Sequence, residues 1–189
     1  MNLEYSANYW DNYYGGSYED TYQRGFSMDL LMVEWGKNFE NKPKSFADIG
    51  CGPGQTLKEA ESALGSDARV YGVEVQPLPP ARVVSDKIIF ANFLDIYKRL
   101  DPVDLLYVAC SMYIPWGEQE HFLKACLGLA DRAVCFANVY LEDGDGIPDD
   151  EFRAVIYRDR DSFSNAIESL GDFVRVCDNR DFFIRTDKI

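Results

Sequence analysis

The sequence has little that would support a metal centre, a membrane span or a polyanionic partner. One histidine, His121, occurs in 189 residues, and the 5 cysteines form no C-x-x-C pair, which does not fit a zinc site and favours reduced, buried thiols. The longest stretch without a charged residue, 105–117, contains Ser111 and Pro115 and is shorter than the about 20 apolar residues of a membrane span. Only 19 basic residues stand against 32 acidic ones, and the net charge of −13 disfavours nucleic acid as a partner.

The N-terminus also lacks the features of a secretory signal. The first basic residue is Arg24, and no positively charged start leads into an apolar stretch, so we expect a cytoplasmic protein. With 47% apolar and 27% charged residues, the chain can bury a sizeable core, which excludes the disordered, collagen-like and coiled-coil classes. The length is that of one domain with room for an appendage.

Apolar runs alternate with helical patterns along most of the chain. Strands are predicted over 46–50, 68–75, 87–91, 103–110 and 132–141, and helices over 55–64, 93–100 and 119–130. This alternation predicts right-handed βαβ units and an open, mostly parallel sheet. Near the C-terminus, a predicted helix over 162–170 precedes two strands, 173–177 and 182–186, at hairpin spacing.

The first forty residues differ from the remainder of the chain. Six of the 12 tyrosines lie in the first 22 positions, together with Trp10. The segment 28–35 then predicts one amphipathic helix that packs on the sheet. We therefore divide the chain into an aromatic-rich cap and helix over 1–40 and a main domain over 41–189.

A glycine-rich turn follows the first predicted strand. Residues 48–54 read Asp-Ile-Gly-Cys-Gly-Pro-Gly, and such a turn lets a ligand approach the backbone. The dinucleotide pattern G-x-G-x-x-G fails, because Gln55 and Leu57 occupy the last position in the two possible frames. A phosphate-binding Walker loop fails too, since no Gly-Lys-Ser/Thr follows. What remains is an acid two residues before a G-x-G-x-G turn.

This turn resembles the first motif of class I S-adenosylmethionine-dependent methyltransferases, and the resemblance covers roughly residues 40–189. Glu74 ends the second predicted strand, where the family places an acid that accepts hydrogen bonds from the cofactor ribose. Asn92 and Phe93 follow the third strand, where the family usually has an acid and a small residue beside the adenine. Asparagine departs from that pattern, although its side-chain oxygen can still accept a bond.

The resemblance implies the fold, the cofactor and the residues that bind it. The implied fold is an α/β, seven-stranded, mostly parallel Rossmann-like sheet with helices on both faces and an antiparallel C-terminal hairpin. The implied cofactor is S-adenosylmethionine, with S-adenosylhomocysteine as its product. Asp48 would order the turn or meet the cofactor amine through water, and Cys110 would line the floor of the site or simply fill space. The implied cofactor-binding residues are Asp48, Gly50, Cys51, Gly52, Gly54, Glu74, Val75, Asn92, Phe93 and Cys110.

Aromatic residues supply the candidates for substrate binding. The N-terminal run 9–14 is similar to the lids of small-molecule methyltransferases; the alternative is a helix that packs its rings on the sheet. A second group is expected on the loop at the C-terminal edge of the sheet, as a substrate contact or a hydrophobic anchor. The candidates in these two places are Tyr9, Trp10, Tyr14, Tyr113 and Trp116.

No catalytic base is evident, and three residues are candidates for that role. Tyr13 belongs to the N-terminal run and Tyr113 to the loop after the fourth strand. His121 could act as a base, but its position beside Glu118 and Glu120 on a predicted helix favours a solvated surface residue.

Several methyltransferase subclasses are excluded by missing signatures. The segment 110–116, Cys-Ser-Met-Tyr-Ile-Pro-Trp, lacks the Asn/Asp-Pro-Pro-Tyr of amino-group nucleic-acid and glutamine methyltransferases, and no cysteine follows a proline as C5-cytosine enzymes require. No acid ends the fourth strand, so no metal is expected. We predict direct in-line methyl transfer to a small, neutral or cationic molecule. A protein or peptide methyltransferase and a non-catalytic S-adenosylmethionine-binding protein are the alternatives.

Overall fold

The computed structural model describes residues 28–75, 77–78, 80, 83–108, 117–137, 160–177 and 181–188. Seven of the candidate site residues lie outside these ranges: Tyr9, Trp10, Tyr13, Tyr14, Cys110, Tyr113 and Trp116. The last parts of the strands predicted over 103–110 and 132–141 also lie outside them.

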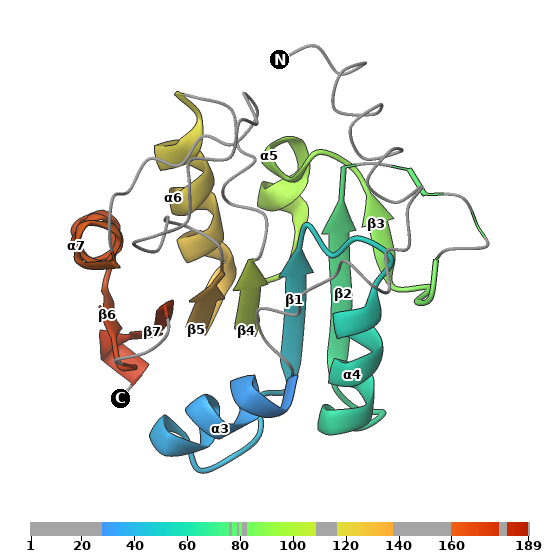
Figure 1. Cartoon of the computed structure of the whole chain (residues 1–189), viewed down its shortest axis with the longest axis horizontal. Coiled ribbons are helices and arrows are strands. Elements are labelled where there is room, and N and C mark those ends of the chain that lie inside the picture. The colour runs from blue at the N-terminus through green and yellow to red at the C-terminus, as the bar shows by residue number, and fades with distance from the viewer. Residues whose placement is uncertain are drawn as a thin grey trace, which may run out of the picture.

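Seven strands form one sheet in the order β3-β2-β1-β4-β5-β7-β6 (Figure 1). The strands are β1 (Ser45–Ile49), β2 (Arg69–Glu74), β3 (Ile88–Phe90), β4 (Val103–Val108), β5 (Ala130–Phe136), β6 (Phe173–Arg175) and β7 (Asp181–Arg185). Strands β1 to β5 pair in parallel, whereas β7 pairs antiparallel with both β5 and β6. The last strand is thus inserted between β5 and β6, and the predicted sheet with its C-terminal hairpin is confirmed.

Helices cover both faces of the sheet. They are α3 (Met28–Asn38), α4 (Gln55–Leu64), α5 (Phe93–Ile96), α6 (Gln119–Leu129) and α7 (Arg160–Leu170), with short 3-10 helices at Tyr97–Arg99 and Thr186–Lys188. The helix predicted over 93–100 is divided, because the Leu100 N–H bonds to the Tyr97 carbonyl in the tighter 3-10 pattern. Strand β5 begins two residues earlier than predicted. Within the described ranges, no helix is long and apolar enough to cross a membrane.

Two apolar cores lie between these helices and the sheet, one on each face. On one face, Met28, Leu31 and Trp35 of α3 are buried in the same cluster as Phe46 of β1 and Leu57 of α4. On the other face, a second cluster unites residues of α5, α6 and α7 with the sheet. A fully buried large apolar side chain contributes about 1.5–3 kcal/mol, so α3 is anchored to the sheet by its packing.

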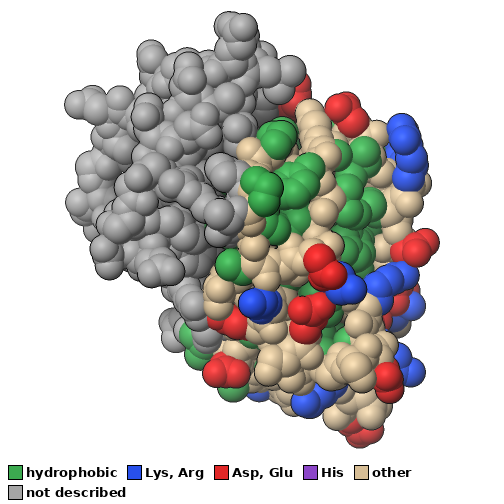
Figure 2. Space-filling model, turned by 90° about the vertical axis from the view of Figure 1, so that its right-hand side faces the viewer, with side chains coloured by type: hydrophobic (Ala, Val, Ile, Leu, Met, Phe, Trp, Pro, Cys, Tyr) green, Lys and Arg blue, Asp and Glu red, His purple; other side chains and the backbone are tan. Residues whose placement is uncertain are grey.

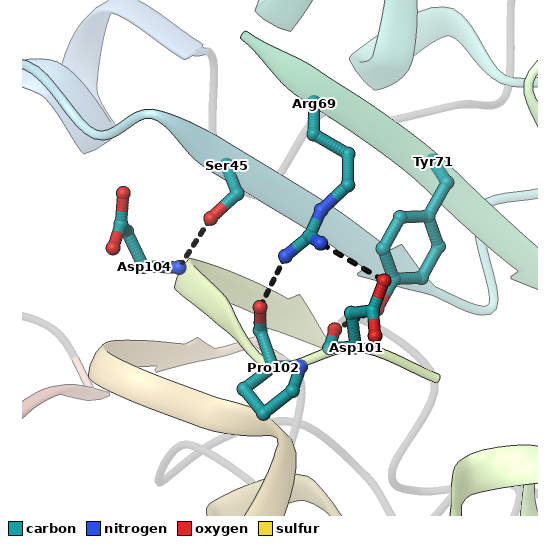
Figure 3. Close-up of polar contacts among 6 residues, drawn as sticks. All are labelled: Ser45, Arg69, Tyr71, Asp101, Pro102 and Asp104. Atoms are coloured by element: carbon teal, nitrogen blue, oxygen red, sulfur yellow. Dashed lines mark hydrogen bonds and ion pairs between the residues drawn. The ribbon is translucent and has the colours of Figure 1, made fainter. Parts of the chain in front are cut away.

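Polar side chains join the strands at the opposite edge from the glycine-rich turn, where β1, β2 and β4 begin. Figure 3 shows this amino-edge network, which comprises Ser45, Arg69, Tyr71, Asp101, Pro102 and Asp104. Arg69 pairs with the Asp101 carboxylate at 3.1 Å and donates to the Pro102 carbonyl. The Tyr71 hydroxyl donates to the Asp101 carbonyl at 3.1 Å, and burial raises the pKa of Tyr71 to about 12. The network ties β2 to the start of β4, across β1.

Candidate active site

The glycine-rich turn follows β1 at the point where the strand order reverses. Strand β1 pairs with β2 on one side and with β4 on the other, so crossovers leave it in both directions. Open α/β sheets bind ligands outside the carboxyl ends of the strands at such a switch point. The turn at 50–54 therefore occupies the position where this architecture places a ligand.

Three glycines give the turn a backbone conformation that other residues adopt at a cost. The φ angles of Gly50, Gly52 and Gly54 are 77°, 53° and 88°, all in the left-handed region. The Gly50 N–H donates to the Val73 carbonyl at 2.8 Å, which ties the turn to β2. A Cβ on Gly54 would lie 2.9 Å from the Cβ of Ser85, so the segment after β2 closes the other side of the turn.

The acid at the end of β2 makes direct contact with this turn. Glu74 is 6% exposed, and its Oε2 accepts the Gly52 N–H at 2.8 Å. The hydrogen bond is buried, and its two residues are 22 positions apart in the chain. The structure thus brings together two residues that the sequence predicts for one site.

Asp48 lies beneath the turn as a second buried acid. It is 2% exposed, and it stands opposite Gly72 on β2 and Tyr107 on β4. Burial raises the pKa of Asp48 to about 8; a hydrogen bond with the Thr56 side chain opposes this rise, and the charge of Glu74 adds to it. Among the described residues, no donor reaches Oδ1 of Asp48. A buried acceptor without a partner is costly, so this atom marks a place for a proton or a ligand.

Gly72 supports the site in a way that the sequence analysis missed. A Cβ at this position would lie 2.5 Å from Sγ of Cys51 and 2.8 Å from Cδ1 of Leu57, so only glycine lets the turn and α4 approach β2 this closely. Cys51 is 7% exposed, and its thiol fills that space. A lone glycine inside a strand pattern is the signal that could have revealed this close approach.

The residues predicted beside the adenine have different surroundings. Val75, directly after β2, is 46% exposed. Asn92 is exposed, and its Oδ1 accepts the Leu94 N–H at 3.1 Å as the N-cap of α5. Phe93 is 5% exposed and lies edge-on to Phe122 with ring centroids 5.5 Å apart. The ring of Phe93 is therefore part of the core, and it is the backbone of Phe93 that lies after the end of β3.

Apolar side chains are exposed on the same side of the molecule. Val75, Val84, Ile89 and Phe90 are each more than a third exposed, and Figure 2 shows hydrophobic side chains gathered on the side that carries the edge strand β3. Phe90 stands opposite Glu74 in the β2–β3 register. An apolar surface therefore adjoins the buried carboxylate.

His121 lies on α6 and is exposed. Its described contacts are with Tyr97, whose hydroxyl is 3.4 Å from Nε2 and whose ring stands edge-on to the imidazole. Within the described ranges, no group of three or more His, Cys, Asp or Glu side chains could hold a metal ion.

Solved structures share this architecture. The magnesium protoporphyrin IX methyltransferase ChlM from Synechocystis PCC 6803, solved with bound S-adenosylmethionine, matches with a TM-score of 0.56 and 13% identity, over 95% of this chain and 97% of that one. The chain has the class I methyltransferase fold. A chain of the complex formed by the Haloferax volcanii Trm112 methyltransferase activator matches with a TM-score of 0.54 and 17% identity, over 70% and 62% of the two chains.

The plantazolicin methyltransferases are longer proteins. BamL, solved with a triazolic desmethylPZN analog and S-adenosylhomocysteine, has a TM-score of 0.50 and 17% identity, over 68% of this chain. The chain spans 43% of the length of BpumL and 48% of that of BamL. No family model matches the sequence, and no curated protein matches it.

Proposed function

We propose that the chain is an enzyme that transfers a methyl group from S-adenosylmethionine to a small molecule. The observation that carries this proposal is the buried hydrogen bond of 2.8 Å between the Gly52 N–H and Glu74, at the switch point of the sheet. It joins a left-handed glycine turn to an acid at the end of the next strand. The methyltransferase fold supports the proposal.

The residues at this edge fit the chemistry of an adenosyl cofactor. Glu74 offers carboxylate oxygens to ribose hydroxyls, and the unpartnered Oδ1 of Asp48 can accept a bond from the amine or from a bridging water. Val75 and Phe90 offer apolar surface to an adenine ring, and Asn92 offers an amide beside it. The glycines of the turn allow the ligand to lie against the backbone.

S-adenosylmethionine supplies, when bound, a methyl group on a positively charged sulfonium. Direct transfer needs an acceptor aligned with that carbon and a site from which water is excluded. In this chain, the turn and Glu74 would hold the nucleoside, and the buried carboxyl of Asp48 would face the cationic end. No covalent bond to the protein is required.

The substrate class is proposed from charge and from aromatic residues. A net charge of −13 favours a neutral or cationic acceptor over an anionic one. Tyr9, Trp10, Tyr14, Tyr113 and Trp116 are the proposed substrate contacts, and Tyr13, Tyr113 and His121 are the candidate catalytic residues. We propose a cytoplasmic enzyme that acts without a metal, a nucleic acid or a membrane.

The proposed role of the N-terminal aromatic run can be tested by deletion. Removal of residues 1–25 should weaken cofactor binding or slow turnover if the run closes over the site. The measurement is the Kd for S-adenosylmethionine and the rate with the identified acceptor. Unchanged values of both would show that these residues do not form a lid.

Calorimetric titration tests the cofactor assignment. Purified protein should bind S-adenosylmethionine and S-adenosylhomocysteine with micromolar affinity and should not bind NAD. The Glu74→Ala variant should lose this binding. Binding of neither adenosyl ligand would overturn the proposed function.

An acceptor screen with labelled S-adenosylmethionine then tests the substrate class. Label should enter one or more small amines, hydroxy compounds or thiols. Label in peptides alone would move the function to peptide methylation, and cofactor binding without any transfer would identify a non-catalytic protein.

A further inference from the structure

Two buried carboxyl groups lie at one turn, one beneath it and one beside it. Asp48 is 2% exposed on β1, and Glu74 is 6% exposed at the end of β2. Their charges act on each other, and this repulsion helps to raise the pKa of Asp48 to about 8. A negative charge on Glu74 therefore opposes the ionisation of Asp48.

The described groups around Asp48 do not supply a positive charge that could take the place of a proton. Thr56 of α4 hydrogen-bonds the carboxyl, and Gly72 and Tyr107 flank it on the neighbouring strands. The thiol of Cys51 lies beside Gly72 in the turn above. Among the described residues, the charged group that acts on Asp48 is Glu74, which is also negative. A proton on Asp48 or a bound cation would therefore reduce the repulsion from Glu74 and give Oδ1 a partner.

We propose that the Asp48–Glu74 pair holds one proton while the site is empty and releases it when a cationic adenosyl ligand binds, so that the pair distinguishes S-adenosylmethionine from S-adenosylhomocysteine. The inference rests on the proposed function. The two ligands share an ammonium and a carboxylate, whose charges balance, and they differ by one methyl group and by the positive charge of the sulfonium. On binding the cation, the O–H bond of the carboxyl breaks, the proton passes to solvent, and the carboxylate balances the sulfonium charge.

This exchange makes affinity depend on pH for one ligand and not for the other. If one proton leaves on binding, the affinity for S-adenosylmethionine rises about tenfold per pH unit below the pKa of the pair. The affinity for S-adenosylhomocysteine should change less than twofold over the same range. Raising the pH from 6 to 7.5 would therefore strengthen the binding of the methyl donor and leave the binding of the product nearly unchanged. The enzyme would then prefer the methyl donor over the product more strongly at pH 7.5 than at pH 6.

Calorimetry in buffers of different ionisation enthalpy counts the protons released. At pH 7, wild-type protein should release close to one proton per bound S-adenosylmethionine and close to none per S-adenosylhomocysteine. Asp48→Asn should bind both ligands with no proton release, and Asp101→Asn, at the opposite edge of the sheet, should behave as wild type. Binding of both ligands with equal proton release, or with none, would overturn the inference.

Carbon-13 NMR of the ligand-free protein gives a second and independent result. One carboxyl resonance, absent or shifted in Asp48→Asn, should titrate near pH 8. Titration of every carboxyl below pH 5 would overturn the inference even if both ligands bind. If neither ligand binds, the proposed function fails first, and the NMR result still decides whether the pair holds a proton.

Discussion

The polar groups at the two edges of the sheet differ in burial and in hydrogen bonding, although strands β1 and β2 run from one edge to the other. At the amino edge, the groups satisfy one another: Arg69 bonds to Asp101 and Pro102, and Tyr71 bonds to the Asp101 carbonyl. Asp101 there is 79% exposed. At the carboxyl edge, Asp48 and Glu74 are buried beside left-handed glycines, and Oδ1 of Asp48 lacks a donor among the described residues.

This difference separates a structural polar cluster from a site. The amino-edge network holds β4 to β2, and the guanidinium of Arg69 and the hydroxyl of Tyr71 already donate to acceptors of the chain itself. At the carboxyl edge, the two buried carboxyl groups and the Oδ1 without a donor are energetically unfavourable, and a bound ligand can reduce this cost. Proteins retain such costs at sites that bind ligands. The variants below test whether the two edges respond as differently as their contacts predict.

The largest expected effect is the pH dependence of stability at Asp48. The folded pKa of Asp48, about 8, lies above its value of 3.8 without burial, so the folded state holds a proton that the unfolded state has lost. The associated stability is fully present below pH 3.8 and is lost as pH rises through about 8, by about 1.4 kcal/mol per pH unit within this window. Asp48→Asn removes this loss, so its stability should increasingly exceed that of wild type from pH 5 to pH 8.

Urea unfolding of the two proteins at each pH measures this gap. The same comparison with Asp101→Asn should show no gap that widens with pH. A constant difference between wild type and Asp48→Asn across the range would contradict a protonated Asp48 in the folded protein.

The next effect comes from the space around Gly72. In Gly72→Ala, the new Cβ meets Cys51 and Leu57, and such overpacking costs about 1–3 kcal/mol. The matched control is Gly128→Ala in α6, where a Cβ meets nothing within 4 Å. Because alanine has the higher helix propensity, this control should raise the free energy of unfolding, by at most about 1 kcal/mol. Thermal unfolding measures both. Equal effects of the two substitutions would show that the turn can yield without cost.

The smallest effects are expected at the amino edge. Tyr71→Phe removes one hydrogen bond, which is worth about 0.5–1.5 kcal/mol, and Asp101→Asn weakens an exposed ion pair worth about 0–1 kcal/mol. Neither variant should change the Kd for S-adenosylmethionine by more than twofold. A tenfold change would show that the two edges are coupled.

Much of the fold could be predicted from the sequence because its signals are local. Helix α4 has the predicted bounds, since Leu57 and Ala60 mark its buried face and Gly65 ends it with a φ of 91°. Glu74 falls at the end of β2 as expected. The mostly parallel sheet and its C-terminal hairpin follow from the alternation and spacing of the elements and from the resemblance to a known family.

The remainder depends on contacts between distant residues. The bond from the Gly52 N–H to Glu74 is fixed by the register of β1 on β2, which no local pattern specifies. The burial of Asp48 depends on how α4 covers the sheet. Asn92 was expected to bind adenine, and its use as the N-cap of α5 was missed although asparagine before a helix is a common cap.

The affinity of wild type and of two variants for S-adenosylmethionine decides whether the cofactor binds at the carboxyl edge of the sheet. Glu74→Gln keeps the size of the side chain but removes its charge, and loss of charge-assisted hydrogen bonds should weaken binding by about 10- to 100-fold. Asp101→Asn should bind within twofold of wild type. Weaker binding confined to Glu74→Gln would place the cofactor at the carboxyl edge, and wild-type affinity in Glu74→Gln would show that Glu74 does not hold the cofactor.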